Sequence, residues 1–355
     1  MELSCCLIVK DEEKTLGRVL ECAKKIADEI VVVDTGSTDK SMEIAKSYTD
    51  KIYYFEWCDD FSKARNFAFS KASKEYLMWL DADDFIDDDN IAKIIQYKAK
   101  NKHYDVVFMR YATAFDKNGK PTFCFKRERI VKNLPQFRFV DPIHEVIIPS
   151  GKIIDLDITI EHRKEKESDP LRNLKIYENL MKKGIPFSSR MQFYYANELF
   201  YTNDFKKAIN VYEDYLSKPA YVENQIQACL NLAKCYYKLE ETAKAKQTLF
   251  RSFNFDIPRA ELLCELSLYL INENLFNQAI YWLKKAIGKP NYKKGGFILP
   301  DCYDFVPYYN LAFCEYKMNH IKSAIKYAKK AFSIKPADDS VKHNLNFYKS
   351  LLREK

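Results

Sequence analysis

Three short apolar runs in the first part of the chain lead into charged residues. They span Leu3–Val9, Glu29–Asp34 and Tyr76–Leu80. Unbroken apolar runs of this length are typical of strands that are buried on both faces of a parallel sheet. Between the first two runs, apolar residues from Thr15 to Ile26 recur at helical spacing. The pattern predicts strand–helix–strand units of an open α/β fold, in which ligands bind at the carboxyl ends of the strands.

A second helix and a basic residue are expected between the second and third runs. Gly36 makes a turn after the second run, and Ser37 and Asp39 are both suitable N-caps for the helix that follows. Arg65 comes just before the helix that leads to the third run. An arginine there could hold a phosphate with two parallel hydrogen bonds, or it could be a charge on a helix surface.

The third run leads directly into the acidic sequence Asp81-Ala82-Asp83-Asp84. Two carboxylates one residue apart at the mouth of a buried sheet repel each other, and a divalent cation such as Mg²⁺ or Mn²⁺ relieves the repulsion. A polar turn, continued by the acids at 87–89, is the alternative. The upstream strands and Arg65 favour the cation, because they supply the other parts of a nucleotide site.

Further strands are expected after this acidic sequence. Val106–Arg110 and Pro121–Phe125 have strand patterns, and they are followed by Ile143-His144-Glu145 and by Asp157–Arg163, which contains His162. Two of the five histidines of the chain lie in these last two segments. The sequence alone leaves open whether either histidine is structural or functional.

Small residues recur at fixed helical positions from Phe193 onward. One series is Ala196, Ala233, Ser267 and Ala312, and twelve residues later come Ala208, Ala245, Ala279 and Ala324. Prolines close the units at Pro219, Pro258, Pro290 and Pro336, and the long third step contains an insertion from Asn291 to Asp304. This pattern resembles tetratricopeptide repeats and predicts four helical pairs and a final helix at His343–Leu352. Such an array commonly offers a groove for a peptide.

Composition is that of a globular chain with two domains. Of the 355 residues, 47% are hydrophobic and 15% are aromatic, which excludes a disordered protein. The first apolar run ends before Lys10, so it is a strand rather than a signal peptide, and no run is long enough to span a membrane. The ten cysteines contain no C-x-x-C pair, which favours reduced thiols and a cytoplasmic location over zinc or disulfides.

Positive charge is concentrated in the second half of the chain. Residues 1–165 hold 27 Lys and Arg against 30 Asp and Glu, and the remaining residues hold 30 against 20. A solvated helical surface explains this excess, and an acidic partner is the alternative. We expect no nucleic-acid partner, because basic and aromatic residues do not alternate in any segment.

The motifs of the first part resemble the nucleotide-binding half of the family 2 glycosyltransferases, which have the GT-A fold. They are V-K-D-E after the first strand, V-D-T-G-S-T-D after the second, A-R-N before the third helix, and L-D-A-D-D. By this resemblance, Val9 and Glu12 line the uracil and ribose pocket, Asp34 binds the base, Arg65 lies near the pyrophosphate or base, Asp81 holds the ribose side, and Asp83 binds the metal that bridges the phosphates.

The same resemblance extends to the later segments. Family members with C-terminal helical repeats carry a similar I-H-E segment and a strand that ends in His, which implies His162 as a third metal ligand. Glu145 is our candidate for the base that activates the acceptor, and Asp141 is the second candidate. The expected cofactors are Mg²⁺ or Mn²⁺ and a UDP-sugar donor.

We therefore expect two domains. Residues 1–167 form an α/β GT-A domain, Rossmann-like with a mostly parallel sheet, and residues 168–355 form an all-α tetratricopeptide-like domain. The fusion is similar to bacterial peptide glycosyltransferases of the bacteriocin type, which implies metal-dependent, inverting sugar transfer to Cys, Ser or Thr of a peptide or protein. Transfer to a cell-envelope glycan, or a non-catalytic scaffold of repeats, are the alternatives. A homodimer is compatible with each of them.

Overall fold

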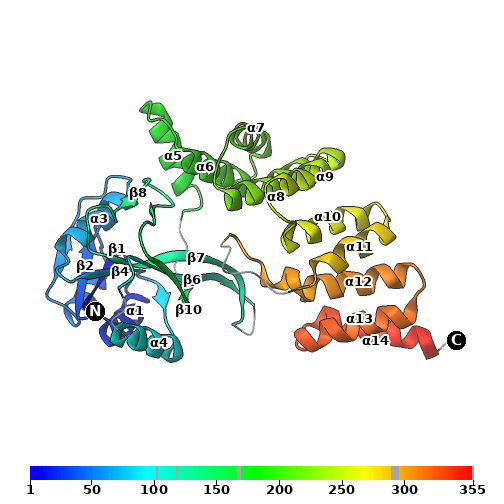
Figure 1. Cartoon of the computed structure of the whole chain (residues 1–355), viewed down its shortest axis with the longest axis horizontal. Helices are drawn as coiled ribbons and strands as arrows, with labels where there is room; N and C mark the ends of the chain where they lie inside the picture. Colours follow the sequence, from blue (N-terminus) through cyan, green and yellow to red (C-terminus); the bar gives the residue numbers. More distant parts are fainter. Residues whose placement is uncertain (101–102, 117–118, 166–168, 289–295, 354–355) are drawn as a thin grey trace. The chain divides into compact units, whose positions relative to one another are not determined.

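The computed structural model describes residues 1–100, 103–116, 119–165, 169–288 and 296–353. Contacts divide the chain into two compact units, Met1–Pro186 and Phe187–Lys355. The first unit is built around a sheet, and the second is helical (Figure 1). This confirms the predicted fold class, a Rossmann-like domain followed by helical repeats.

The main sheet of the first unit contains eight described strands. They are β1 (Leu3–Val9), β2 (Glu29–Asp34), β3 (Ile52–Tyr54), β4 (Tyr76–Asp81), β5 (Asp84–Phe85), β6 (Val106–Phe115), β7 (Pro121–Lys132) and β10 (Ile153–His162). Their order in the sheet is β3-β2-β1-β4-β7-β6-β10-β5. The four strands from β3 to β4 are parallel, and β7 runs antiparallel to both of its neighbours. A separate hairpin pairs β8 (Phe139–Val140) with β9 (Val146–Ile147).

Helices cover both faces of this sheet. The helices are α1 (Leu16–Ile26), α2 (Ser41–Lys46), α3 (Phe61–Lys71) and α4 (Asp88–Ala99). Apolar residues of α1, α2 and α4 share one core cluster, whereas residues of α3 and the β8–β9 hairpin share the other. Figure 1 shows α1 and α4 together on one side of the strands and α3 on the other.

The alternation of side chains along β4 decides what reaches each face. Tyr76, Met78 and Leu80 lie in the core with α1, and Leu77 and Trp79 lie in the core with α3. The acidic sequence begins at Asp81, the last residue of β4, and therefore starts on the α3 side of the sheet.

The structure corrects two predicted helix starts. The residue that precedes α2 is Lys40 rather than Ser37 or Asp39, although Asp39 Oδ1 accepts a hydrogen bond from Ser41 N (2.9 Å). Helix α3 begins at Phe61, because the Asp60 carboxylate caps it by accepting a hydrogen bond from Lys63 N (3.0 Å). Arg65 therefore lies inside α3 rather than before it.

Helix α5 (Arg172–Lys182) follows β10 and belongs to the first unit. The Arg172 guanidinium lies 5.0 Å from the centroid of the Phe61 ring, a contact within that unit. The expected domain boundary between residues 167 and 168 falls outside the described residues. The contact-based division instead comes after α5, at Pro186.

The second unit is a series of helical pairs. The pairs are α6 (Ser189–Tyr201) with α7 (Phe205–Leu216), α8 (Val222–Lys238) with α9 (Thr242–Arg251), α10 (Ala260–Asn272) with α11 (Phe276–Ala286), and α12 (Phe305–Lys317) with α13 (Ile321–Ile334). Two short 3₁₀ helices, η1 (Ser252–Asn254) and η3 (Pro300–Tyr303), lie between pairs, and α14 (Asp339–Arg353) closes the series. Among the described helices, none is both long enough and apolar enough to cross a lipid bilayer.

Backbone and packing repeat with the same period. One turn residue with positive φ joins the helices of each pair: Asn203 (63°), Glu240 (63°), Asn274 (60°) and Asn319 (63°). The eight small residues that the sequence singled out are at most 3% exposed. These features confirm the predicted repeats. Pro290 and the predicted insertion up to residue 295 fall outside the described residues, and the final helix begins at Asp339, four residues before the predicted start.

All ten cysteines are free thiols, and Cys58 alone among them is exposed. Burial raises the pKa of most of the others, for example to about 12 for both Cys229 and Cys235. Inert, apolar thiols are what the sequence predicted for these positions.

Glu29 anchors the start of β2. Its carboxylate accepts hydrogen bonds from Ser73 N (2.8 Å) and Ser73 Oγ (2.7 Å), and it also contacts Ser4 Oγ and Lys51 Nζ. Burial opposes the negative charge, but the bonds from Lys51, Ser4 and Ser73 outweigh it and lower the pKa of Glu29 from 4.5 to about 2.

We expect Glu29→Gln to lower the free energy of unfolding by about 2–3 kcal/mol at pH 7, because folding favours the charged carboxylate. Because folding lowers this pKa, the contribution is complete above 4.5, declines as the pH falls towards 2, and is lost below that. Urea unfolding at pH 7 and at pH 3.5 measures the effect, and the gap between wild type and variant should narrow at the lower pH. Glu56→Gln, at an exposed glutamate, is the control. If the difference in unfolding free energy between wild type and variant is the same at both pH values, the lost stability comes from packing instead.

Candidate active site

The acidic residues of the predicted site meet at the carboxyl edge of the sheet. In the register of β1, Val9 pairs with Asp34 of β2, and Ile8 pairs with Asp81 of β4. Asp34 and Asp81 thus end the two strands that flank β1. This edge is where open α/β sheets bind their ligands.

Three of the predicted nucleotide residues lie where β1 and β2 end: Val9 and Asp34 are the last residues of these strands, and Glu12 lies in the loop after β1. Asp34 Oδ1 accepts hydrogen bonds from Gly36 N (3.2 Å) and Ser37 N (2.8 Å), and Gly36 has φ = 103°, which a residue with a side chain rarely adopts. Glu12 Oε2 accepts a hydrogen bond from Thr15 Oγ1 (2.9 Å). Asp34 and Glu12 are half-buried at this edge, whereas the Val9 side chain lies in the core and offers only its backbone.

Asp81, Asp84 and His162 form a group of metal-ligating side chains. One ligand atom from each lies within 4.8 Å of the other two. The antiparallel register of β5 and β10 brings His162 beside Asp84. The Tyr111 hydroxyl of β6 lies 2.8 Å from both Asp81 Oδ2 and Asp84 Oδ1, and 2.9 Å from His162 Nδ1. Two carboxylates fit Mg²⁺ or Mn²⁺, and the imidazole favours Mn²⁺ of the two.

Asp83, the metal ligand that the motif implied, lies beside this group. Asp83 Oδ1 is 3.0 Å from His162 Nδ1, and Asp84 Oδ1 is 3.7 Å from the same atom. Burial disfavours a charge on His162, but its bonds to Asp83 and Asp84 and the charges of Asp81 and Asp83 outweigh burial and raise its pKa from 6.5 to about 10. The carboxylates therefore attract positive charge strongly to this position.

A buried ion pair holds Asp84 in place. Arg129 of β7 and Asp84 are both fully buried, and Arg129 Nη1 lies 3.0 Å from Asp84 Oδ2. The Arg129 guanidinium also lies 3.8 Å from the Trp79 ring centroid and 4.1 Å from that of Tyr111. Asp84 Oδ2 accepts a further hydrogen bond from Asp81 N (3.0 Å). Arg129 thereby fixes the acidic turn from inside the protein.

Arg65 connects the donor residues with the predicted base. Its Nη2 lies 2.5 Å from Asp81 Oδ1, and its Nε lies 2.6 Å from Glu145 Oε1. The guanidinium is buried and lies 4.7 Å from the Trp79 ring centroid. Burial opposes its charge, but Asp81 and Glu145 outweigh burial and raise the pKa of Arg65 above its usual value. The structure therefore places Arg65 between two carboxylates, where the resemblance had implied a contact to the nucleotide.

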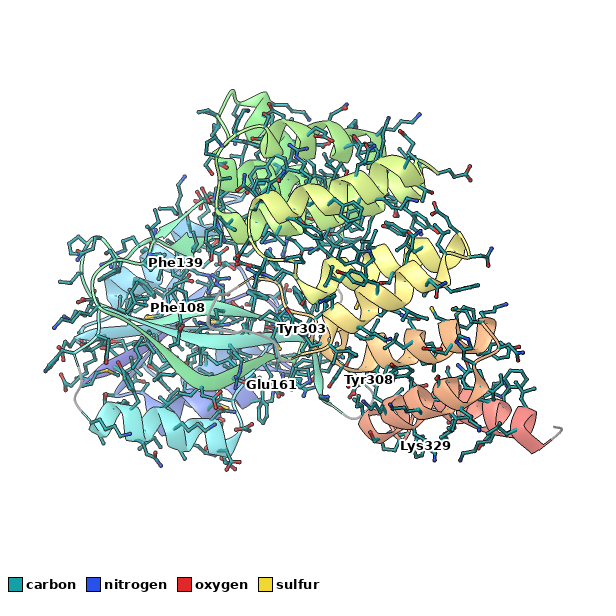
Figure 2. The ribbon with its side chains drawn as sticks, turned by 45° about the vertical axis from the view of Figure 1, so that its right-hand side comes forward. Phe108, Phe139, Glu161, Tyr303, Tyr308 and Lys329 are labelled. Atoms are coloured by element: carbon teal, nitrogen blue, oxygen red, sulfur yellow. The ribbon has the colours of Figure 1, made fainter. Side chains whose placement is uncertain are left out.

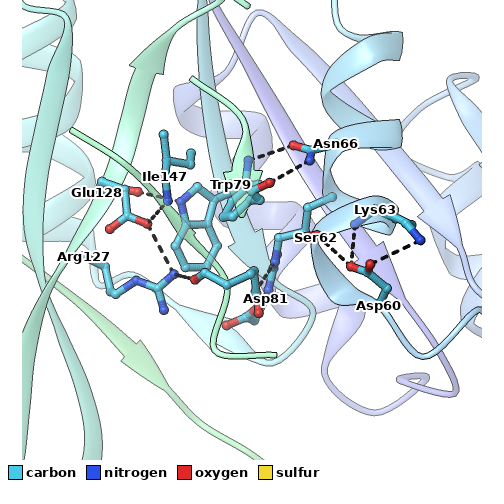
Figure 3. A network of polar contacts seen from close by, with 12 residues as sticks. Asp60, Ser62, Lys63, Asn66, Trp79, Asp81, Arg127, Glu128 and Ile147 are labelled. Carbon is cyan, nitrogen blue, oxygen red and sulfur yellow. Dashed lines mark hydrogen bonds and ion pairs between the residues drawn. The ribbon is translucent and has the colours of Figure 1, made fainter. Parts of the chain in front are cut away.

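The loop that carries Glu145 is held by β7. Arg127 Nη2 donates a hydrogen bond to the Glu145 carbonyl oxygen (2.8 Å). Glu128 Oε1 accepts one from Ile147 N (3.1 Å), and Figure 3 shows this bond beside Arg127. His144 has a φ of 53°, in the region that residues with side chains adopt at an energetic cost. Glu145 itself is 7% exposed. The predicted base is thus fixed by its surroundings rather than free in solvent.

The second candidate base lies in the same loop. Asp141 has a φ of 67° and is half-buried. The neighbouring Pro142 carbonyl oxygen accepts a hydrogen bond from Phe61 N (2.8 Å), which ties the loop to the start of α3. Asp141 and Glu145 therefore both remain predictions for the base.

The structure unites the residues of separate motifs in one network. Tyr111 and Arg129 belong to this network although no motif pointed to them, because their contacts come from the pairing of β6, β7 and β10. One available signal was the sequence Lys126-Arg127-Glu128-Arg129, which puts four charged residues in the middle of strand β7. Asp84 was part of the acidic motif but had no assigned role.

Comparisons with known proteins agree with this architecture. Residues 4–162 match the model of Glycosyl transferase family 2, and residues 307–338 match a Tetratricopeptide repeat model. A TPR repeat-containing protein of Synechococcus elongatus is 32% identical over 41% of this chain and 35% of its own length. The prophage-derived glycosyltransferase SunS of Bacillus subtilis is 24% identical over 64% of this chain and 58% of its own length. The structure of S. aureus TarS 1–349 with UDP-GlcNAc shares 17% identity, with a TM-score of 0.44 over 70% of this chain and 90% of that one.

The extent of these matches defines what they establish. The chain spans about a third of the first of these relatives and somewhat more than half of the second. The family 2 match covers almost the whole described sheet, from the second residue of β1 to the last residue of β10. Residues 4–162 therefore form a domain similar to Glycosyl transferase family 2, and tetratricopeptide-like repeats follow it in the same chain.

Proposed function

We propose that this chain is a metal-dependent glycosyltransferase that moves a sugar from a UDP-sugar to a peptide or protein side chain. The observation that carries the proposal is the network at the carboxyl edge of the sheet. It joins a carboxylate–histidine group (Asp81, Asp84 and His162) through Arg65 to a second carboxylate, Glu145. One end of the network suits a diphosphate with its cation, and the other suits a proton acceptor.

The donor residues take defined roles in this proposal. Asp34 and Glu12 hold the base and ribose, and Asp83 and His162 hold the cation with the carboxylates of Asp81 and Asp84 close by. A Mg²⁺ or Mn²⁺ held there would supply positive charge to the diphosphate oxygens as UDP leaves the anomeric carbon. Arg65 keeps Asp81 in place beside this group.

The acceptor step uses Glu145. Its carboxylate takes the proton from the hydroxyl or thiol of the acceptor, and the oxygen or sulfur attacks the anomeric carbon. The bond from that carbon to the UDP oxygen breaks, and its electron pair leaves with UDP. Attack from the face opposite the leaving group inverts the anomeric configuration. Asp141 is the alternative base.

The repeats support a peptide or protein acceptor, because arrays of this kind present an extended binding surface. A cell-envelope glycan is the alternative acceptor. A non-catalytic scaffold is less well supported, because the carboxylates, His162 and Arg65 form one connected network.

The test combines two measurements on the full chain. The protein is incubated with a panel of UDP-sugars, with and without Mn²⁺, and with peptides that contain Cys, Ser or Thr or with a lipid-linked glycan. We expect metal-dependent UDP release and a peptide mass increased by one sugar residue. Modification of the glycan alone would replace the peptide acceptor, and the absence of UDP release from every donor would refute the enzymatic proposal.

A further inference from the structure

Residues 296–303 of the repeat unit lie across the first helices of three successive pairs. We call these residues the inner segment. The Phe297 ring centroid is 6.0 Å from that of Phe193 on α6. Gly296, with φ = 89°, lies so close to α8 that a Cβ added there would clash with the Glu223 carboxylate. The segment therefore follows the surface that α6, α8 and α10 form together.

Helix α10 holds the segment through a buried carboxylate. Glu261 Oε1 accepts a hydrogen bond from Leu299 N (2.9 Å), and Oε2 accepts one from Tyr303 OH (3.2 Å); Figure 2 labels Tyr303 at the end of the segment. Glu261 is 6% exposed, and burial raises its pKa above the usual 4.5. Ile298 is buried as well. Since a buried carboxylate needs hydrogen-bond donors, the main chain and the tyrosine of the segment satisfy a requirement that α10 creates.

The fit leaves a cavity of about 160 Å³ beside the segment. Its lining combines the charged or polar groups of Glu223, Gln227, Arg259 and Glu261 with the rings of Phe297 and Tyr303. Arg259 Nη2 lies 2.6 Å from Glu223 Oε1. This surface offers polar side chains to a peptide backbone and apolar contacts to peptide side chains, which is how extended peptides are recognised.

We propose that the inner segment is an internal ligand of the repeats, and that an acceptor peptide binds this surface by displacing it. This inference rests on the proposed peptide acceptor. It adds the surface that binds the peptide and identifies the inner segment as the competitor for that surface. The partner that fits is an extended peptide with consecutive apolar residues, like Phe297-Ile298-Leu299, and a main-chain N–H placed to bond Glu261.

The cost of displacement follows from the covalent tether. Because the segment belongs to the same chain as the surface, it binds there intramolecularly, at an effective concentration of about millimolar. A peptide then binds with an apparent affinity reduced by the fraction of molecules whose surface is open. If about one molecule in ten is open, the apparent Kd of the peptide rises about tenfold.

Weakening the segment tests this directly in the full chain. The double variant Phe297→Ala/Ile298→Ser removes two anchors and leaves α8 and α10 unchanged. We expect the KM for the acceptor peptide to fall about 3–10-fold, with kcat and the KM for the UDP-sugar unchanged. Phe347→Ala, at a ring of α14 that is 39% exposed, is the matched control and should change none of the three. An unchanged or raised peptide KM in the double variant overturns the proposal.

A second variant covers the case in which the double variant does not fold. Tyr303→Phe removes one hydroxyl and its bond to Glu261. It should lower the peptide KM about 2–3-fold, in line with the loss of one hydrogen bond. Circular dichroism confirms that each variant keeps its helices. No decrease in KM for a folded Tyr303→Phe protein counts against the internal ligand.

A binding measurement separates this inference from the proposed function. The probe is a fluorescein-labelled peptide with the sequence of residues 296–303, carrying Cys302→Ser. Anisotropy should show at least about 3-fold tighter binding to the Phe297→Ala/Ile298→Ser protein than to the wild type, and Glu261→Gln in that background should weaken it. Equal binding to both proteins refutes the internal ligand. The expected difference in a protein that modifies no peptide would refute the acceptor and keep the internal ligand.

Discussion

His162→Ala should remove most of the metal-dependent activity. The imidazole belongs to the group with Asp81 and Asp84 and also contacts Asp83, the ligand that the motif implied. It is therefore part of the metal site whether Asp83 or Asp84 supplies the carboxylate. The loss of a ligand that helps to neutralise a leaving diphosphate should lower turnover at least about 100-fold, a barrier increase of about 3 kcal/mol or more. Calorimetry with UDP, with and without Mn²⁺, should show that the gain in affinity on adding the metal largely disappears.

Three further variants make this test specific. His343→Ala, at an exposed histidine of α14, is the matched control and should keep wild-type turnover. Asp83→Asn and Asp84→Asn distinguish the carboxylates, since the one that binds the cation should lose the response to Mn²⁺. Asp84→Asn should also lower the melting temperature, because it leaves Arg129 buried without its carboxylate, at a cost of about 3–5 kcal/mol. An unchanged metal response in His162→Ala would exclude the imidazole as a ligand.

Glu145→Gln should lower turnover by about 10²–10⁴-fold while UDP binds as before. The amide keeps the shape of the side chain and its contact with Arg65 but cannot take the proton of the acceptor. Steady-state kinetics with saturating donor measure the loss in kcat, and calorimetry measures UDP affinity. If the acceptor is a thiol, the loss should shrink at high pH, because the thiolate then forms without a base.

Companion variants decide between the candidate bases and define the role of Arg65. Glu75→Gln, at an exposed glutamate, should be neutral, and Asp141→Asn should cost the activity if Asp141 is the base instead. Arg65→Gln should reduce kcat with little change in UDP affinity if it positions Glu145. A large loss of UDP affinity would place Arg65 at the nucleotide. Full turnover by Glu145→Gln at neutral pH would remove Glu145 from the mechanism.

Local sequence patterns predicted the parts of the fold that depend on neighbouring residues. The apolar runs that became β1, β2 and β4 bury nearly every side chain, so their composition alone identifies them. Helix starts were less predictable, because several residues before a helix can cap it. The Asp60 carboxylate caps α3, so the helix begins at Phe61 and includes Arg65.

Contacts between distant residues could not be predicted in this way. Tyr111 reaches Asp81 and His162 because β6 pairs with β10, and that register depends on the whole sheet. The contact of Phe297 with Phe193 joins positions more than a hundred residues apart, through a segment whose sequence shows only an interruption of the repeat. In both cases the contacting residues are far apart in the sequence, so local patterns could not predict that they are neighbours in the fold.

The single exposed thiol has a practical consequence. Cys58 lies in the loop between β3 and α3, two residues before the Asp60 cap of the helix that carries Arg65, while the other nine cysteines are enclosed in the two units. A thiol-reactive dye applied to the native protein therefore has one accessible point of attachment. The chain carries a natural site for a fluorescent reporter close to the helix that connects donor and acceptor residues, without the need to engineer cysteines in or out.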